Sequence, residues 1–287
     1  MPPTPSRLSL VPRSLAARVD DIEVALLVEG VFRRYGFDFR PYAPDPLRRR
    51  ILEHARAEQL PSVSRLQERV LRDRECFERL VTTLSDTGCI LFQNPAFFST
   101  FRREVAPRLR TRSRPRLWHL GCSTGAEIYS MAVVLEEEGL HDAVRVYATE
   151  VSDGPLRQAA AGSFPLERLR AAELSYRAAG GKARLADYYR TEGGQGVFRP
   201  RLRDQVVFAS HNIGTDASFN EFDVVVCRNV MPRLGQALRS RVHRLVYDSL
   251  ATSGYIGLGR GEDMRHTPFE LQYEPVGARS GLFRKRT

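Results

Sequence analysis

The chain has 287 residues, of which 42% are hydrophobic, so it can bury the core of one or two domains. Its formal charge is +10, but every basic residue except Lys182 and Lys285 is an arginine, and these arginines occur on all the expected elements. A basic stripe interleaved with aromatic residues is absent, which argues against a nucleic-acid-binding protein.

No apolar run approaches the length of a membrane span, so we expect no insertion into a membrane. The first residues lack the apolar segment of a signal peptide, and we therefore expect a cytoplasmic protein. The four cysteines have neither zinc-like nor disulfide-like spacing, which predicts reduced thiols and no metal site.

The amino-terminal part is expected to be helical. Residues 1–15 are rich in proline and serine and are predicted to form a disordered tail. Apolar residues then recur at helical spacing through residues 16–107, which predicts an all-α domain. Its helices are expected near residues 22–32, 47–60, 63–71, 77–84 and 97–105. A basic, turn-rich linker over residues 108–115 leads to the next domain.

Residues 116–130 are the most informative stretch. An apolar run stops at Gly121, a turn of small residues follows, and a helix is predicted to begin near Gly125. A strand, glycine turn and helix in this order present backbone N–H groups to a nucleotide-like ligand. The same residues also fit the Gly-x-Ser-x-Gly turn of a hydrolase, with Ser123 as nucleophile. No earlier strand and no glycine-rich oxyanion loop is predicted, so the ligand-binding turn is favoured.

The second domain, residues 116–287, is predicted to be α/β. Strands are expected at residues 116–120, 144–149, 205–209, 222–226 and 254–259, with a closing hairpin of 269–273 and 281–286. Because helices alternate with the first five strands, the sheet should be mostly parallel. Two β-rich runs around a Gly-Gly pair predict a small antiparallel flap near residues 187–202, with an ordinary surface hairpin as the alternative.

Four segments carry a family resemblance. Residues 122–130, 147–150, 211–213 and 226–231 resemble, in this order, the successive signatures of the CheR-type chemotaxis receptor methyltransferases. With the helical part, the resemblance covers roughly residues 20–285. It implies a class I, Rossmann-like methyltransferase sheet behind an all-α domain, with S-adenosylmethionine (SAM) as cofactor. It also implies that the protein esterifies glutamate side chains of a receptor.

The resemblance assigns roles around the first two strands. Gly121 and Gly125 would let the backbone approach SAM closely, because a Cβ there would obstruct it. Glu127 matches a family glutamate near the SAM amino group, although a first-turn glutamate stabilised by the helix dipole is the plain alternative. Glu150 stands where the family usually has Asp, at the position whose carboxylate binds the ribose.

Four further cofactor contacts are implied by the later motifs. Asn212 and Ile213 match an Asn-Leu pair that flanks the adenine, while Arg228 and Asn229 match a pair that contacts the cofactor. His211 matches no family role, so we interpret it as structural.

The chain departs from the family pattern where the acceptor is held. Thr87, Cys89 and Gln93 replace the Asn, Thr and Arg of one family motif, and Arg233 replaces the active-site tyrosine. Methyl transfer to an ionised carboxylate needs no general base, but a nearby cation helps to orient the acceptor. We therefore hypothesise that Arg233 supplies the cation that Gln93 lacks. The alternative is a catalytically impaired SAM-binding regulator or scaffold.

The expected partner is the cytoplasmic domain of a methyl-accepting receptor or a similar signalling protein. The family's helical domain presents an arginine-rich helix to acidic receptor helices. The second predicted helix carries several arginines but also Glu53 and His54, which would interrupt a basic face. The arginines are Arg48, Arg49, Arg50 and Arg56. A solvated charged surface is the alternative interpretation.

Overall fold

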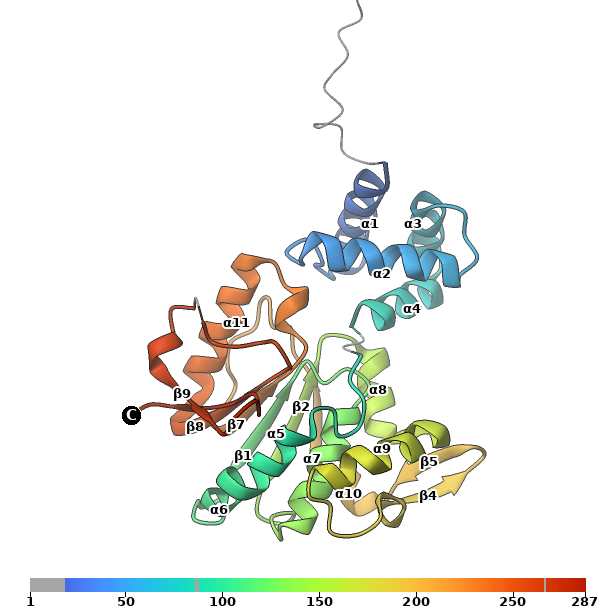
Figure 1. The fold of residues 1–287 in the computed structure, drawn as a ribbon. Helices are drawn as coiled ribbons and strands as arrows, with labels where there is room; N and C mark the ends of the chain where they lie inside the picture. The colour runs from blue at the N-terminus through green and yellow to red at the C-terminus, as the bar shows by residue number, and fades with distance from the viewer. Residues whose placement is uncertain (1–18, 86–87, 266) are drawn as a thin grey trace, which may run out of the picture. The chain divides into compact units, whose positions relative to one another are not determined.

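The computed structural model describes residues 19–85, 88–265 and 267–287 (Figure 1). The expected tail, residues 1–15, and Thr87 lie outside the described residues. The chain divides into two compact units. The first consists of Pro44–Leu80 and the described residues up to Arg40, and the second of Pro41–Ala43 and Val81–Thr287.

The first unit is built from helices, as the apolar periodicity predicts. They are α1 (Val19–Tyr35), α2 (Pro44–Ala57), α3 (Val63–Arg72) and the first part of α4 (Arg74–Ser85). The Ser62 side chain caps α3 by accepting a hydrogen bond from the Arg65 amide at 3.3 Å. His54 is buried in α2, and burial lowers its pKa. The expectation that His54 interrupts a basic surface of α2 is therefore wrong.

The second unit contains a seven-stranded sheet in the order β6-β2-β1-β7-β8-β10-β9. The strands are β1 (Arg116–Leu120), β2 (Arg145–Glu150), β6 (Val206–Ser210), β7 (Phe222–Cys227), β8 (Leu250–Leu258), β9 (Tyr273–Val276) and β10 (Leu282–Lys285). The first five in this order run parallel, and β10 pairs antiparallel with both its neighbours. The mostly parallel sheet with a closing hairpin is as predicted. Two boundaries differ clearly from those predicted. β8 begins at Leu250, four residues early, and Glu270–Gln272 form a 3₁₀ turn, η4, before β9 begins.

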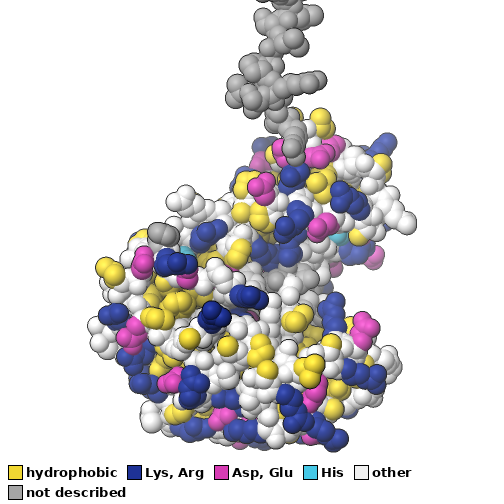
Figure 2. Space-filling model, viewed as in Figure 1, with side chains coloured by type: hydrophobic (Ala, Val, Ile, Leu, Met, Phe, Trp, Pro, Cys, Tyr) yellow, Lys and Arg dark blue, Asp and Glu magenta, His cyan; other side chains and the backbone are white. Residues whose placement is uncertain are grey.

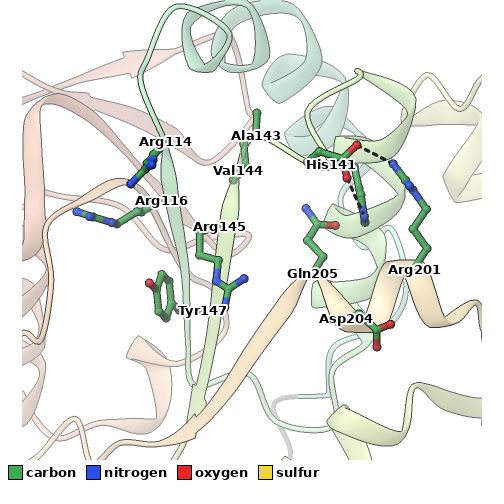
Figure 3. Close-up of a pocket in the computed structure, with 11 residues that line it drawn as sticks. Arg114, Arg116, His141, Ala143, Val144, Arg145, Tyr147, Arg201, Asp204 and Gln205 are labelled. Atoms are coloured by element: carbon green, nitrogen blue, oxygen red, sulfur yellow. Dashed lines mark hydrogen bonds and ion pairs between the residues drawn. The ribbon is translucent and has the colours of Figure 1, made fainter.

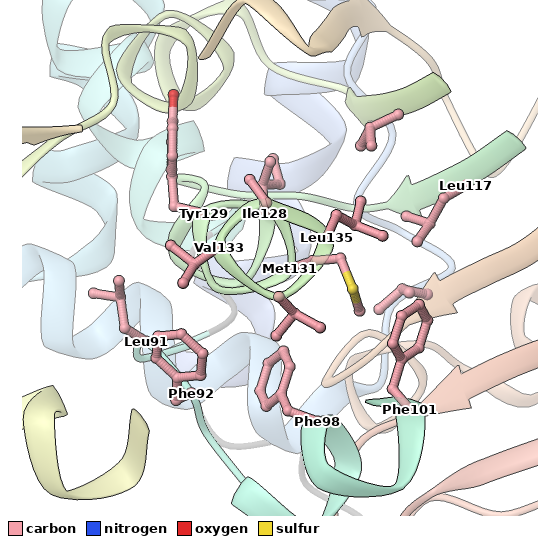
Figure 4. Packing of buried hydrophobic residues seen from close by; sticks show 14 of the residues in the cluster. Leu91, Phe92, Phe98, Phe101, Leu117, Ile128, Tyr129, Met131, Val133 and Leu135 are labelled. Carbon is pink, nitrogen blue, oxygen red and sulfur yellow. The ribbon is translucent and has the colours of Figure 1, made fainter. Parts of the chain in front are cut away.

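Helices cover both faces of this sheet. One face carries α5 (Pro95–Thr100), a π-helical turn η1 (Phe101–Val105), α6 (Ala106–Leu109), α7 (Ala126–Glu137), α8 (Asp153–Ala161), α9 (Leu166–Ala178) and α10 (Pro200–Asp204). The other carries α11 (Gln236–Ser249), which packs on Trp118, Val225 and Ile256. Figure 4 shows Phe98 and Phe101 packed beside α7 in the same core as Leu117. The described residues within 81–107, which the periodicity placed in the helical domain, thus group with the sheet, and their aromatic side chains help to fill its core.

A separate three-stranded sheet forms the flap. Its strands are β3 (Ser163–Pro165), β5 (Gln195–Phe198) and β4 (Tyr189–Glu192), in this order in the sheet. A 3₁₀ turn, η2 (Leu185–Tyr188), directly precedes β4. Gly193 and Gly194 connect β4 to β5 with φ of 52° and 78°, which favours glycine at both positions. The sequence predicts this hairpin but not the third strand, β3.

The surface and the described helices add two observations. Figure 2 shows Lys and Arg side chains interspersed with acidic ones over the visible face, without a single basic stripe. Within the described ranges, no helix combines the length and apolar character needed to cross a membrane, and no three His, Cys, Asp or Glu residues are grouped as a metal site would need.

Candidate functional site

The predicted cofactor-binding residues of the second unit lie at, or shortly after, the carboxyl ends of four adjacent strands. β6, β2, β1 and β7 are consecutive in the sheet, and the segments that carry the motifs follow each of them. Ligands of open parallel sheets bind at this edge. The sheet therefore brings together motifs that are about 100 residues apart in the chain.

The glycine turn after β1 is held by the end of β2. The amides of Gly121 and Cys122 donate hydrogen bonds to the Thr149 carbonyl at 3.0 and 2.9 Å. Gly121 and Gly125 have φ of 71° and 89°, and Gly125 caps α7. The Ser123 side chain lies inside this turn and is 1% exposed, so its hydroxyl is not presented as a hydrolase nucleophile would be.

Glu150 ends β2 and fixes the same turn. Its carboxylate accepts hydrogen bonds from the backbone amides of Ser123 at 3.0 Å and Val151 at 2.8 Å. Burial raises the pKa of Glu150, while these two hydrogen bonds and the charge of Arg233 act in the opposite direction. Glu150 thus connects the first two strands through their loops.

Glu127 and Arg228 form a buried ion pair across the site, between the first turn of α7 and the end of β7. The Arg228 side chain is 1% exposed, also donates to the Gln93 carbonyl at 2.8 Å, and lies 4.4 Å from the Phe97 ring centroid. Burial raises the pKa of Glu127, and Arg228 opposes this shift. Arg228 Nε is buried without a hydrogen-bond partner in the described part of the chain.

Asn229 links β7 to the segment before α5. It has a φ of 61°, and its Nδ2 donates to Gln93 Oε1 at 3.1 Å and to Cys89 Sγ at 3.0 Å. Cys89 and Gln93, which the sequence analysis interprets as departures from the family pattern, are therefore joined to a predicted cofactor residue. The resulting cluster of Cys89, Gln93 and Asn229 is neutral.

Glu262 is a site residue that the sequence interpretation missed. Its carboxylate accepts hydrogen bonds from the amides of Asn229 at 3.0 Å and Met231 at 3.1 Å, and another from Gly259. Burial raises its pKa. It holds the backbone in the turn after β7. The only signal in the sequence is an acidic residue shortly after the glycine-rich end of β8.

Asn212 and Ile213 follow β6. Asn212 Oδ1 accepts a hydrogen bond from the Gly214 backbone amide at 2.9 Å. The backbone amide of Asn212 donates to the Asp216 carboxylate at 2.8 Å. Ile213 packs against the core on the α11 face. His211 lies edge-on to Trp118 and its Nε2 is 3.1 Å from the Ala217 carbonyl, contacts that fit the structural role expected of it.

Arg233 lies in a 3₁₀ turn, η3 (Met231–Arg233), beyond Asn229. Its Nη1 donates to the Ser85 carbonyl at 3.0 Å, and its charge acts on the Glu150 carboxylate. The contacts described for Arg233 thus place it by Ser85 and Glu150, and those of Gln93 place it by Asn229 and Arg228.

Comparisons with known proteins agree with this geometry. Residues 86–278 match the family model of the CheR methyltransferase SAM-binding domain, and residues 22–85 match that of the CheR methyltransferase all-alpha domain. The putative methyltransferase Cher3 of Pseudomonas putida is 38% identical over 268 residues, covering 93% of this chain and 98% of the relative. Chemotaxis protein methyltransferase 1 of Pseudomonas aeruginosa is 26% identical, covering 74% and 80%.

Solved structures show a more distant likeness. The SAM-bound amino pentose methyltransferase CalS10 from Micromonospora echinaspora is 19% identical, with a TM-score of 0.32. The match covers 56% of this chain and 50% of that one, so the chain spans about half the length of this structure. The two family models together extend over most of the sequence. The chain therefore belongs to the CheR family of SAM-dependent methyltransferases.

Proposed function

We propose that the protein transfers the methyl group of SAM to glutamate side chains of a methyl-accepting receptor's cytoplasmic domain or a similar signalling protein. The observation that carries this proposal is the meeting of four strand ends, with the glycine turn and the Glu127–Arg228 pair, at one edge of a CheR-family sheet. The names of relatives, chemotaxis protein methyltransferases of Pseudomonas aeruginosa and Listeria innocua, support a receptor as acceptor.

The residues at this edge fit the methionine end of SAM. A Cβ at Gly121 would approach Val230 Cγ2 to 2.9 Å, so this part of the turn accommodates only a bare backbone. Glu127 and Arg228 offer a carboxylate and a guanidinium, which complement the ammonium and carboxylate of an amino acid. The Arg228 Nε, buried without a partner in the described residues, provides a further donor for that carboxylate.

The residues after β2 and β6 fit the nucleoside end. We assign Glu150 to the ribose hydroxyls, Asn212 to the edge of the adenine and Ile213 to its face. The domain division proposed with this function gives cofactor binding to the sheet unit and receptor recognition to the helical one.

Catalysis then depends on positioning. SAM supplies a methyl group activated by its sulfonium, and a glutamate carboxylate is already ionised at neutral pH, so no general base is required. The chain's task is to hold that carboxylate in line. Gln93 Oε1 accepts a hydrogen bond from Asn229, which leaves Gln93 Nε2 as a donor. We assign this donor to the carboxylate that receives the methyl group. We assign to Arg233 the positive charge that gathers and orients the acceptor.

The central test combines two measurements on the purified protein. Calorimetry is expected to show saturable SAM binding, and a radiolabelled assay to show base-labile methyl transfer to chemoreceptor cytoplasmic domains from the same source. Absence of SAM binding would overturn the site assignment.

A variant series tests the role of Arg233. Arg233→Ala is expected to lower kcat/KM for the receptor at least tenfold, whereas Arg233→Lys keeps the charge and most of the activity. SAM affinity serves as the control for folding. Unchanged transfer by Arg233→Ala would rule out a compensating cation.

The neutral cluster of Cys89, Gln93 and Asn229 favours one alternative function, a SAM-binding regulator or scaffold with impaired catalysis. SAM binding without methyl transfer would support it. Gln93→Arg, which restores the family's arginine, is expected to create transfer in such a protein.

A further inference from the structure

A cavity lies at the amino ends of β1, β2 and β6, the edge of the sheet opposite to the site described above (Figure 3). Its volume is about 610 Å³, which is within the range of small-molecule sites. Its lining includes Arg114, Arg116, Arg145, Tyr147, Arg201 and Gln205. Because methyl transfer is placed at the other edge, nothing in the proposed function accounts for this cavity.

The cavity carries uncompensated positive charge. Arg116 and Arg145 are register partners on adjacent parallel strands, so their side chains leave the same face of the sheet, where like charges repel. Within the described residues, neither these guanidiniums nor that of Arg114 has an ion pair or hydrogen bond. An anion that bridges these arginines would relieve the repulsion.

The acidic residues of the cavity do not neutralise these three arginines. Asp142 is 2.9 Å from Arg201 and 3.8 Å from His141 Nε2. Asp204 is exposed. Neither aspartate is therefore paired with Arg114, Arg116 or Arg145.

Gln205 supplies an independent sign of a ligand. It is 7% exposed, lines the cavity, and both its Oε1 and Nε2 lack hydrogen-bond partners in the described structure. Figure 3 shows its amide between Arg145 and His141, whose buried Nδ1 is also unpartnered. Buried amides are almost always hydrogen-bonded, so a donor and an acceptor are to be expected from a bound molecule.

Tyr147 adds a flat surface beside the charges. It lies two residues after Arg145 on β2, on the same face of the strand, and is half-buried in the cavity wall. Guanidiniums bind phosphate oxygens in pairs, an aromatic ring stacks on a base, and an amide reads a base edge. These three kinds of group occur together in this cavity.

We propose that this cavity binds a nucleoside polyphosphate, with the phosphates on Arg114, Arg116 and Arg145 and the base between Tyr147 and Gln205. The phosphate group alone would leave much of the 610 Å³ and the Gln205 amide unused. This site is separate from the SAM site and does not depend on methyl-transfer activity.

The test is calorimetric titration of the full-length protein with GTP, after saturation with S-adenosylhomocysteine so that the nucleoside site at the carboxyl edge is blocked. One-to-one binding is expected. Arg145→Glu should weaken it at least tenfold and Gln205→Met several-fold. Arg168→Glu, the same charge change on exposed α9 outside the cavity, should leave it unchanged. Undiminished binding of S-adenosylhomocysteine shows that each variant is folded.

Three results would overturn the proposal. The first is no saturable GTP binding up to millimolar concentration. The second is an equal loss in Arg168→Glu, which would indicate nonspecific attraction to a basic protein. The third is pyrophosphate, or a single-stranded oligonucleotide, binding as tightly as GTP with the same dependence on Arg145.

Discussion

At the residue scale, the buried pair of Glu127 and Arg228 makes the strongest energetic prediction. The Arg228 side chain is 1% exposed and that of Glu127 12%, so removing the arginine leaves a carboxylate with little access to water. We expect Arg228→Met to lower the free energy of unfolding by about 3–5 kcal/mol. Urea unfolding can be followed by fluorescence of Trp118, the single tryptophan, which lies buried on β1.

The matched control for this prediction neutralises the other partner as well. Arg228→Met combined with Glu127→Gln should recover most of the lost stability, because no uncompensated charge remains. Both the single and the double variant should bind SAM more weakly than the wild type. A double variant as unstable as the single one would mean that Arg228 acts through its packing on Phe97 instead.

His119 predicts a specific pH dependence. It is 2% exposed on β1, and burial lowers its pKa from 6.5 to about 3, with a smaller effect from the charge of Arg228. Between these two values the unfolded chain binds a proton that the folded chain does not. Burial of the neutral His119 ring therefore costs no stability through protonation above pH 6.5. As the pH falls from 6.5 toward 3, the free energy of unfolding decreases progressively, because only the unfolded chain takes up the proton.

The measurement compares unfolding free energies of the wild type and His119→Gln at pH 7 and pH 5. Lowering the pH should cost the wild type about 2 kcal/mol more than the variant, since pH 5 lies 1.5 units below the ordinary pKa of 6.5. Parallel pH profiles would show that His119 is protonated in the folded state.

The sequence was sufficient to predict where several candidate residues lie, while their roles stay predictions. Glu150 ends β2, Gly121 and Arg228 directly follow β1 and β7, and Gly125 closes the turn after β1. A correct strand assignment was therefore sufficient to predict that they lie at one edge of the sheet. Glu262 was missed because its carboxylate accepts hydrogen bonds from backbone amides of another loop. Every residue except proline has such an amide, so the sequence does not show which residues are bound.

At the element scale, the two ends of α7 provide a matched pair of glycines. Gly125 precedes the helix with a φ of 89°, and Gly139 follows it with a φ of 67°. A Cβ at Gly125 would lie 2.9 Å from Ala159 Cβ and 3.0 Å from its Cα on α8, whereas nothing lies within 4 Å of one at Gly139. Only the first substitution must displace a neighbouring helix.

Both Gly125→Ala and Gly139→Ala should therefore carry the strain of a left-handed backbone, about 1–2 kcal/mol, in urea unfolding. Gly125→Ala alone is expected to weaken SAM binding, at least tenfold by calorimetry, because the turn that α7 and α8 support must move. Similar SAM affinities of the two variants would contradict a role of this close packing in the site.

The parallel strands were predicted more accurately than the helices that cover them or the short strand of the flap. The parallel strands have continuous apolar runs, and β1, β2, β6 and β7 appear within a residue or two of their expected bounds. The segment from α5 to α6 was assigned to the wrong neighbour, since helical periodicity identifies an apolar face but not what covers it. β3 has three residues, too few for an alternating pattern.

At the scale of the whole molecule, the net charge of +10 bears on the proposed acidic partner. With His54 buried, the exposed surface of α2 carries Arg49 and Arg56 with Glu53 between them. Arg48 lies 3.5 Å from Asp21 and is less available. Positions 49, 53 and 56 lie on one side of a helix, so the two arginines can contact the same acidic surface.

We expect Arg49→Glu combined with Arg56→Glu to raise the KM for a receptor cytoplasmic domain several-fold while the KM for SAM stays unchanged. The salt dependence of kcat/KM should also flatten, because the steering charges are gone. The control is Arg168→Glu with Arg244→Glu, an equal charge change on exposed positions of α9 and α11. If both double variants raise the KM equally, attraction depends on net charge alone. An effect confined to positions 49 and 56 would identify α2 as the surface that selects the methylated protein.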